Sequence, residues 1–252
     1  MFTGLGHVRF DRMDSSSPSR PKNRVGRVVG IDVSATRGLD VVLLEEGGHV
    51  QCAKADVSVG EVQRLLMEWN PEAVAIDSPP GPAGAPGATS RACERLLRGY
   101  GVNIFLTPSD GEAFLGRFYE WIRVGAEVFS AAERAGYPRQ QSQTAVRRRA
   151  LEVFPHASEV FLRGSLPPRG TTRRVRSKRA WRVETLKKAD VDVDLLCVNR
   201  VGQPTLDSID AALAALTARK ALEGDFCVVG DPGEWIVLPV GTCSRLHRPT
   251  TA

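Results

Sequence analysis

The sequence predicts an α/β protein with one domain, built on a mixed sheet of about five strands with flanking helices and a C-terminal hairpin. Short apolar strands separated by tight turns predict the sheet, and a helical pattern between two of them predicts a crossover. The length of 252 residues suffices for one large domain and is short for two. We place the domain at residues 25–240, between flexible tails at 1–24 and 241–252.

The first three strands are predicted to form an antiparallel meander. Val28–Asp32 is an apolar run that ends in an acid, and residues 41–44 form a second apolar run. Gly47-Gly48 is a two-residue hairpin signal that leads into a mixed third strand through Val50 and Cys52. Because such short turns join antiparallel neighbours, the three strands should lie side by side.

A crossover helix is predicted to separate the meander from the fourth strand. Apolar residues recur at helical spacing from about Val59, and Asn70-Pro71 ends the pattern. The apolar run 73–77 then predicts a strand buried on both faces, as a central parallel strand is. The right-handed crossover rule allows it to lie beside the first strand. Asp32 and Asp77 would then meet at the carboxyl edge, where open α/β sheets place ligands.

The second half of the chain is predicted to be mostly helical. A Gly/Pro-rich loop at 79–88 precedes a helix that starts at about Thr89. A longer helix is expected at 111–134, with Phe118 and Trp121 on its apolar face. The other expected elements are a strand at 151–154 that Pro155 stops, helices at 181–188 and 205–222, and a hairpin at 226–240 that turns at 231–233.

Composition argues against several classes of protein. No apolar run approaches the roughly 20 residues that a membrane span needs, and the N-terminus lacks the apolar centre of a signal peptide. The five cysteines are scattered without a Cys-x-x-Cys pair, so neither a disulfide framework nor a structural zinc site is expected. We therefore expect a cytoplasmic protein without a membrane partner.

Basic residues gather in the segment 163–188, where ten Lys and Arg side chains stand against one acid, Glu184. Such a run can neutralise phosphates and release counterions from nucleic acid, so nucleic acid is the expected partner. A solvated, mobile loop and helix face is the alternative interpretation.

Two acids, Asp207 and Asp210, open the last predicted helix. Residues three apart share a helix face, and the alanines beside these acids would let the helix approach the sheet edge closely. The alternative is that the two acids are favourable charges near the positive end of the helix dipole.

The order of elements resembles a ribonuclease-H-like domain: three antiparallel strands, a helix, a parallel strand and a late helix that carries acids. Several segments also resemble the domain-of-unknown-function family 429 (DUF429), whose members are regarded as predicted nucleases of this fold. They are Gly30-Ile31-Asp32, Ala75-Ile76-Asp77-Ser78-Pro79, Arg91-Ala92-Cys93, Glu152-Val153-Phe154-Pro155-His156, Lys178, Arg182 and Asp207-Ser208-Ile209-Asp210-Ala211. The first acid, the acid that closes the fourth strand and the late acidic pair (Asp32, Asp77, Asp207 and Asp210) are also similar to those of the Holliday-junction resolvases.

The resemblance implies a metal-dependent nuclease that cleaves phosphodiester bonds. Its implied catalytic residues are Asp32, Asp77, Glu152 and Asp210; Asp32, Asp77, Asp207 and Asp210 would hold Mg²⁺ or Mn²⁺; and Arg91, Lys178 and Arg182 would bind substrate phosphates. Crowded carboxylates repel one another when no cation lies among them, so raised carboxyl pKa values are expected.

Two other functions stay open at this stage. The strand Gly30–Asp32 and the turn at Thr36 are also typical of actin-like-fold phosphotransferases, although those need two such domains and a second phosphate loop. A non-catalytic module that binds nucleic acid or protein, with structural acids, is the other. For His156, capping or packing beside Pro155 competes with a role in proton transfer.

Overall fold

The computed structural model describes residues 26–109 and 116–240. The expected tails at 1–24 and 241–252, and residues 111–115 of the long predicted helix, lie outside the described residues.

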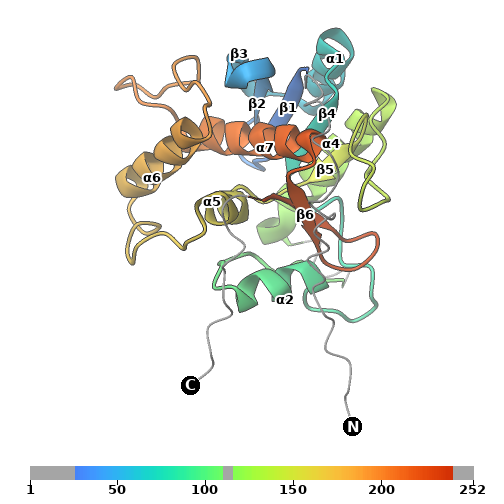
Figure 1. Ribbon diagram of the computed structural model, residues 1–252. Helices are drawn as coiled ribbons and strands as arrows, with labels where there is room; N and C mark the ends of the chain where they lie inside the picture. The colour runs from blue at the N-terminus through green and yellow to red at the C-terminus, as the bar shows by residue number, and fades with distance from the viewer. Residues whose placement is uncertain (1–25, 110–115, 241–252) are drawn as a thin grey trace, which may run out of the picture.

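A five-stranded mixed sheet forms the centre of the protein (Figure 1), with the strand order β3-β2-β1-β4-β5. The first three strands form the predicted antiparallel meander, and the last two run parallel to β1. Their bounds are β1 Val28–Asp32, β2 Leu39–Leu44, β3 Val50–Val57, β4 Ala73–Asp77 and β5 Ala150–Glu152. The predicted α/β class with a mixed sheet of about five strands is therefore confirmed.

Helices cover both faces of this sheet, because alternate strand residues point to opposite sides. Val28 of β1 packs in the core beneath α7 (Leu206–Glu223), and Val29 packs in the core of the other face. That second core also contains residues of α1 (Val59–Trp69) and α4 (Glu120–Arg134). The sheet is thus the middle of three layers.

Helix α7 lies unusually close to β1 at Gly30. A Cβ atom at this position would overlap backbone atoms of Ala211 and Ala215 on α7, so only glycine fits there. The alanines of α7 predicted this close approach. Its consequence is that Asp210, next to Ala211, reaches the carboxyl edge of β1 and β4.

A third, smaller core lies beside the sheet and consists of α2, α5 and a hairpin. The helices are α2 (Ala92–Gly99) and α5 (Pro155–Arg163), and the hairpin is the predicted one, formed by β6 (Phe226–Val229) and β7 (Ile236–Pro239). Helix α6 (Val175–Lys188) packs against α5 and α7. These elements lie around the carboxyl ends of β4 and β5.

Three predicted boundaries in the second half were wrong. The short strand ends at Glu152, and Pro155 is the first residue of α5, a helix that the sequence analysis missed, because proline suits a first helical turn as well as it ends a strand. Helix α2 begins after Arg91 rather than at Thr89, because Glu94 accepts the Arg91 backbone N–H. Helix α6 starts six residues before the expected residue 181.

Two turns also differ from the prediction. Gly47-Gly48 belongs to a 3-10 turn (Glu46–Gly48) between β2 and β3 instead of forming a two-residue hairpin loop. Residues 117–119 form a second 3-10 turn, and α4 starts only at Glu120. As a result, Phe118 precedes the helix on whose apolar face it was expected. No helix in the described part of the chain is long and apolar enough to cross a membrane.

Candidate functional site

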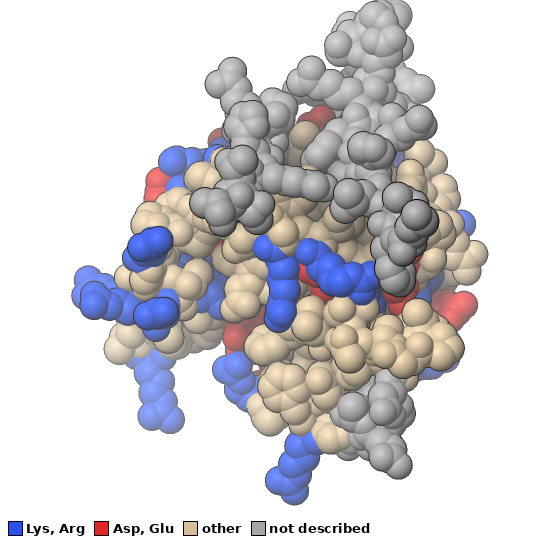
Figure 2. Space-filling view, turned by 90° about the horizontal axis from the view of Figure 1, so that it is seen from below, with Lys and Arg blue, Asp and Glu red and all other residues tan. Residues whose placement is uncertain are grey.

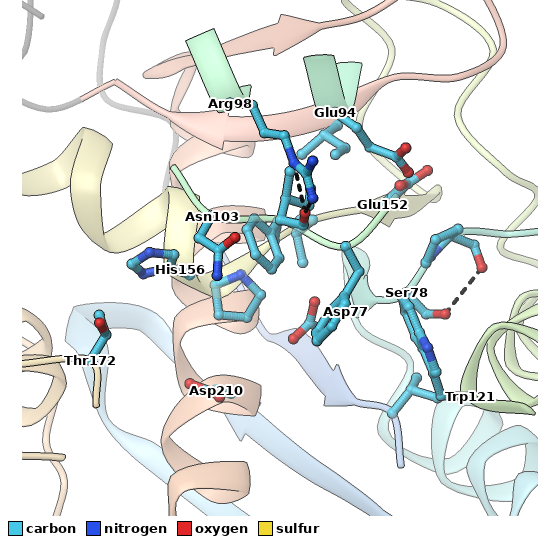
Figure 3. Close-up of a pocket in the computed structure, with 18 of the residues that line it drawn as sticks. Asp77, Ser78, Glu94, Arg98, Asn103, Trp121, Glu152, His156, Thr172 and Asp210 are labelled. Atoms are coloured by element: carbon cyan, nitrogen blue, oxygen red, sulfur yellow. Dashed lines mark hydrogen bonds between the residues drawn. The ribbon is translucent and has the colours of Figure 1, made fainter. Parts of the chain in front are cut away.

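Three acids meet at the carboxyl edge of the sheet, and we call Asp32, Asp77 and Asp210 the acidic cluster. Asp32 and Asp77 pair in register at the ends of the neighbouring parallel strands β1 and β4, so both acids lie at the same edge of the sheet. Asp210 comes from α7, and its carboxylate lies close enough to raise the pKa values of both. Asp77 and Asp210 line one cavity (Figure 3), whereas Asp32 is not among its lining residues.

The acidic cluster carries more negative charge than its surroundings neutralise. Burial and then the repulsion from Asp210 raise the pKa of Asp77 to about 8. Burial, with Asp210 and Asp77 next in effect, raises the pKa of Asp32 well above its ordinary value. Burial also raises the pKa of Asp210, against the opposing effects of Arg182 and Lys178. The expectation of raised carboxyl pKa values is confirmed, and such shifts concentrate at functional sites.

Arg182 joins the acidic cluster to a second buried acid. Its guanidinium forms an ion pair with the Asp210 carboxylate, and its Nε atom lies 3.3 Å from Oε2 of Glu159. The other oxygen of Glu159 lies 2.5 Å from Nδ1 of His156, which lines the cavity. Sequence reasoning missed Glu159, because its spacing of three residues from His156 is informative only once residues 155–163 are known to be helical.

The donor set of the acidic cluster suits a hard divalent cation, because carboxylate oxygens are the ligands that Mg²⁺ and Mn²⁺ prefer. Within residues 26–109 and 116–240, however, no three His, Cys, Asp or Glu side chains are arranged closely enough to hold an ion. Arg182 pairs with the Asp210 carboxylate and supplies positive charge there. The residues of the acidic cluster therefore fit a divalent cation by the chemistry of their oxygens.

Glu152 and Arg91 belong to a separate group, which we call the balanced cluster: Arg91, Glu94 and Glu152. Two nitrogens of Arg91 donate to the two oxygens of Glu152, at 2.9 and 2.6 Å, and its Nε donates to Glu94 at 2.8 Å. Thr107 donates to Glu94 through its backbone N–H and its hydroxyl. Figure 3 shows Glu94 and Glu152 together, away from Asp77 and Asp210.

The balanced cluster changes the interpretation of both sequence-predicted members. Arg91 and Glu152 line the same cavity as Asp77 and Asp210. Arg91 is nevertheless 3% exposed with its donors engaged by carboxylates, and Glu152 is 4% exposed and bound at both oxygens, so they pair with each other rather than with the acidic cluster. The sequence could not predict the pairing of Arg91 with Glu152, because the two residues are 61 positions apart.

Of the remaining predicted residues, Lys178 and Arg182 line the cavity and Asp207 does not. Like Arg91, Arg182 is 3% exposed and paired with two carboxylates. Asp207 forms a 2.6 Å ion pair with Arg37. Sequence reasoning also missed Asp40, which is opposite Asp32 in the β1–β2 register and whose pKa is raised to about 7 by burial and then by Asp207.

The cavity has a volume of about 820 Å³, within the range of roughly 300–1,000 Å³ that is usual for small-molecule sites. It combines the acids Asp77 and Asp210 with basic and aromatic side chains. The basic ones are Arg98, Arg173, Lys178 and Arg182, and the aromatic ones include Phe105, Phe118 and Trp121. Figure 2 views the molecule from the side of α2 and shows basic side chains directly beside acidic ones on this face.

The fold and the site together define an α/β protein with acids of raised pKa at the carboxyl edge of its sheet, beside a cavity lined by acidic, basic and aromatic side chains. The family described as "Protein of unknown function (DUF429)" matches residues 30–234, and the chain belongs to this family. The predicted membership is therefore confirmed. Searches of curated proteins and of solved structures returned no match.

Proposed function

We propose that this protein is a metal-dependent nuclease with a ribonuclease-H-like fold. The observation that carries the proposal is the convergence of Asp32, Asp77 and Asp210 from three separate elements at one edge of the sheet. The meander followed by two parallel strands supports the fold comparison, because it presents the ends of β1 and β4 together. Perturbed acids beside a cavity are the usual mark of a catalytic site.

The acidic cluster would hold Mg²⁺ or Mn²⁺ through the carboxylates of Asp32, Asp77 and Asp210. A bound divalent cation would supply Lewis-acid stabilisation and an activated water for cleavage of a phosphodiester bond. Three carboxylates in a buried place repel one another, so the cluster retains a proton when it lacks a cation. This repulsion is the reason why the site would favour binding of positive charge.

The basic residues of the cavity would bind and orient the substrate phosphate. Lys178 and Arg173 line the cavity, and both offer charge-assisted donors to phosphate oxygens. Arg182 would position Asp210 through their ion pair. Through its bond to Glu159, His156 is held at Nδ1, which leaves its other ring nitrogen to exchange a proton in the cavity.

The test is cleavage of a panel of labelled DNA and RNA oligonucleotides in the presence of Mn²⁺. Asp210→Asn keeps the size of the side chain and removes its charge, so we expect at least 100-fold slower cleavage. Asp231→Asn is the matched control, because Asp231 is an exposed acid in the β6–β7 turn. Failure of the wild type to cleave any substrate, or equal cleavage by Asp210→Asn, would contradict the proposal.

A further inference from the structure

The wall of the cavity carries exposed aromatic rings for which the acidic cluster provides no explanation. Phe105 and Phe118 are each 61% exposed, whereas the other Phe, Tyr and Trp side chains in the described parts of the chain are partly or fully buried. Both line the same cavity as Asp77 and Asp210, and Trp121 lines it with them. Two of the few large apolar groups in contact with water therefore lie at the candidate site.

The three rings form one continuous cluster, which we call the aromatic wall: Phe105, Phe118 and Trp121. The ring centroids of Phe105 and Phe118 are 5.8 Å apart with an interplanar angle of 73°, and Phe105 and Trp121 are 6.2 Å apart at 56°. Rings that meet edge to face leave a ring face uncovered by their neighbour. The cluster can thus offer a ring face to a flat ligand in the cavity.

The loop that carries Phe105 is fixed in place. Arg98 on α2 donates through Nε and Nη2 to the carbonyl oxygen of Ile104, at 3.1 and 2.8 Å, as Figure 3 shows in part. Ile104 is buried in the third core beside α2 and α5. The exposed ring of Phe105 is therefore held by its neighbours, as a preorganised stacking surface should be.

Positive charge lies in the same cavity as the aromatic wall. Arg173 and Lys178 line the cavity, and Arg173 forms no ion pair among the described salt bridges. Aromatic rings beside a basic groove are the combination by which proteins bind single-stranded nucleic acid, with bases stacked on rings and phosphates held by Lys and Arg. An apolar peptide would use the rings and leave the cations without a partner.

The size of the cavity limits the form of nucleic acid that can enter. A volume of about 820 Å³ accommodates a ligand of small-molecule size. An intact double helix, whose major groove alone is about 12 Å wide, is far larger than this space. Its stacked bases are also hidden from the rings. A strand with unpaired bases can place a base on the wall and a phosphate near the cations.

We propose that the cavity binds single-stranded nucleic acid, with an unpaired base stacked on the aromatic wall and the neighbouring phosphate held by Arg173 and Lys178. The inference rests on the proposed function in taking nucleic acid as the substrate, and it names the form of that substrate.

The experiment measures binding of the full chain to fluorescein-labelled oligonucleotides by anisotropy, in chelator so that no cleavage occurs. The probes are a 12-nucleotide single strand, its blunt duplex, and the same strand with abasic sites, which keeps the phosphates and loses the bases. We expect the single strand to bind at least 10-fold more tightly than the duplex or the abasic strand. Equal affinity for the three probes would overturn the inference.

A pair of variants assigns the preference to the aromatic wall. Replacing both Phe105 and Phe118 by alanine should weaken binding of the single strand about 10-fold and leave binding of the abasic strand unchanged. Met67→Ala is the matched control, because Met67 is 64% exposed on α1 and does not line the cavity. Unchanged binding of the single strand by the folded double variant would also overturn the inference.

The outcome separates this inference from the proposed function. Single-strand preference without any Mn²⁺-dependent cleavage would contradict the nuclease and leave the binding site standing. Cleavage without a preference for unpaired bases would contradict the inference and leave the nuclease standing.

Discussion

Two groups of buried acids lie at the same edge of the sheet and differ in how their charge is balanced. In the balanced cluster, Arg91 lies between Glu94 and Glu152 and donates to both carboxylates. In the acidic cluster, Asp32 and Asp77 lie side by side, and the nearest cation, Arg182, is shared by Asp210 and Glu159. In the first group each carboxylate accepts hydrogen bonds from Arg91, whereas in the second only Asp210 forms an ion pair among the described salt bridges.

This difference teaches which buried acids to interpret as functional. Burial raises the pKa of Glu152 and of Asp77, but Arg91 opposes the rise at Glu152, whereas at Asp77 the largest effect after burial is repulsion by Asp210. Position at the carboxyl edge alone would group Glu152 with the aspartates. The hydrogen-bond and ion-pair partners of each carboxylate distinguish Glu152 from the aspartates. These partners predict that substitutions in the two groups change the stability of the protein in opposite directions.

The largest expected effect is on stability, at Arg91. Arg91→Met leaves Glu94 and Glu152 buried without their counter-ion, so we expect a loss of about 3–5 kcal/mol in the free energy of unfolding. Urea denaturation measures it. Arg64→Met is the matched control, since Arg64 also pairs with two glutamates but is 60% exposed, and its loss should stay within about 1 kcal/mol. Equal losses at both positions would refute the assigned role of burial.

The next expected effect is that two isosteric substitutions change the stability of the protein in chelator in opposite directions. Asp77→Asn removes one of several repelling charges and should raise the stability by about 1 kcal/mol, which is roughly 2–4 °C in melting temperature for a domain of this size. Glu152→Gln removes a charge that Arg91 requires and should lower it by about 1.5–3 kcal/mol. Thermal melts of both variants check this, and a shift of the same sign in both would remove the distinction between the clusters.

A smaller effect concerns pH. In the folded state the pKa of Asp77 is about 8, against an ordinary value near 4 in the unfolded chain, so the folded state binds more protons between these values. Stability in chelator should therefore fall as the pH rises from about 5 to 8. Asp77→Asn should flatten this decline. A melting temperature that rises over the same interval by the same amount in both proteins would contradict the account.

The smallest expected effect is in the basic segment. Charge reversal at Arg173, Arg174 and Arg176 should weaken nucleic-acid binding and flatten its salt dependence. Because Arg173 alone of the three lines the cavity, Arg173→Glu should account for about one unit of the slope of log affinity against log salt. Binding measured at several salt concentrations tests this. A slope that none of the substitutions changes would assign these arginines to solvent.

Most of the sheet and the core of the site could be predicted because their signals are local. The apolar runs of β1 and β4 each end in an acid, and a single helical crossover fixes their parallel register, which brings Asp32 to Asp77. Gly30 and the alanines of α7 explain why Asp210 joins them. These features depend on spacing within short segments, and the sequence displays that spacing directly.

The balanced cluster and the aromatic wall could not be predicted, because both depend on contacts between distant segments. Nothing near Arg91 in the sequence shows that Glu152 will accept hydrogen bonds from both of its terminal nitrogens, Nη1 and Nη2. Phe118 and Trp121 fit the apolar face of a helix by spacing, and the 3-10 turn before α4 instead places Phe118 in the cavity wall. The spacing in the sequence identified Phe118 and Trp121 as residues of an apolar face. It could not show whether such a face packs in the core or lines a ligand site.

Calorimetric titration of Mn²⁺ into the wild-type protein at pH 7, in two buffers of different ionisation enthalpy, tests the central claim most directly. Because Asp77 has a pKa of about 8, it must lose a proton to become a ligand. We therefore predict that the wild type binds Mn²⁺ with release of about one proton, and that Asp77→Asn loses this binding. Absence of binding to the wild type, or equal binding with equal proton release by the variant, would contradict the account.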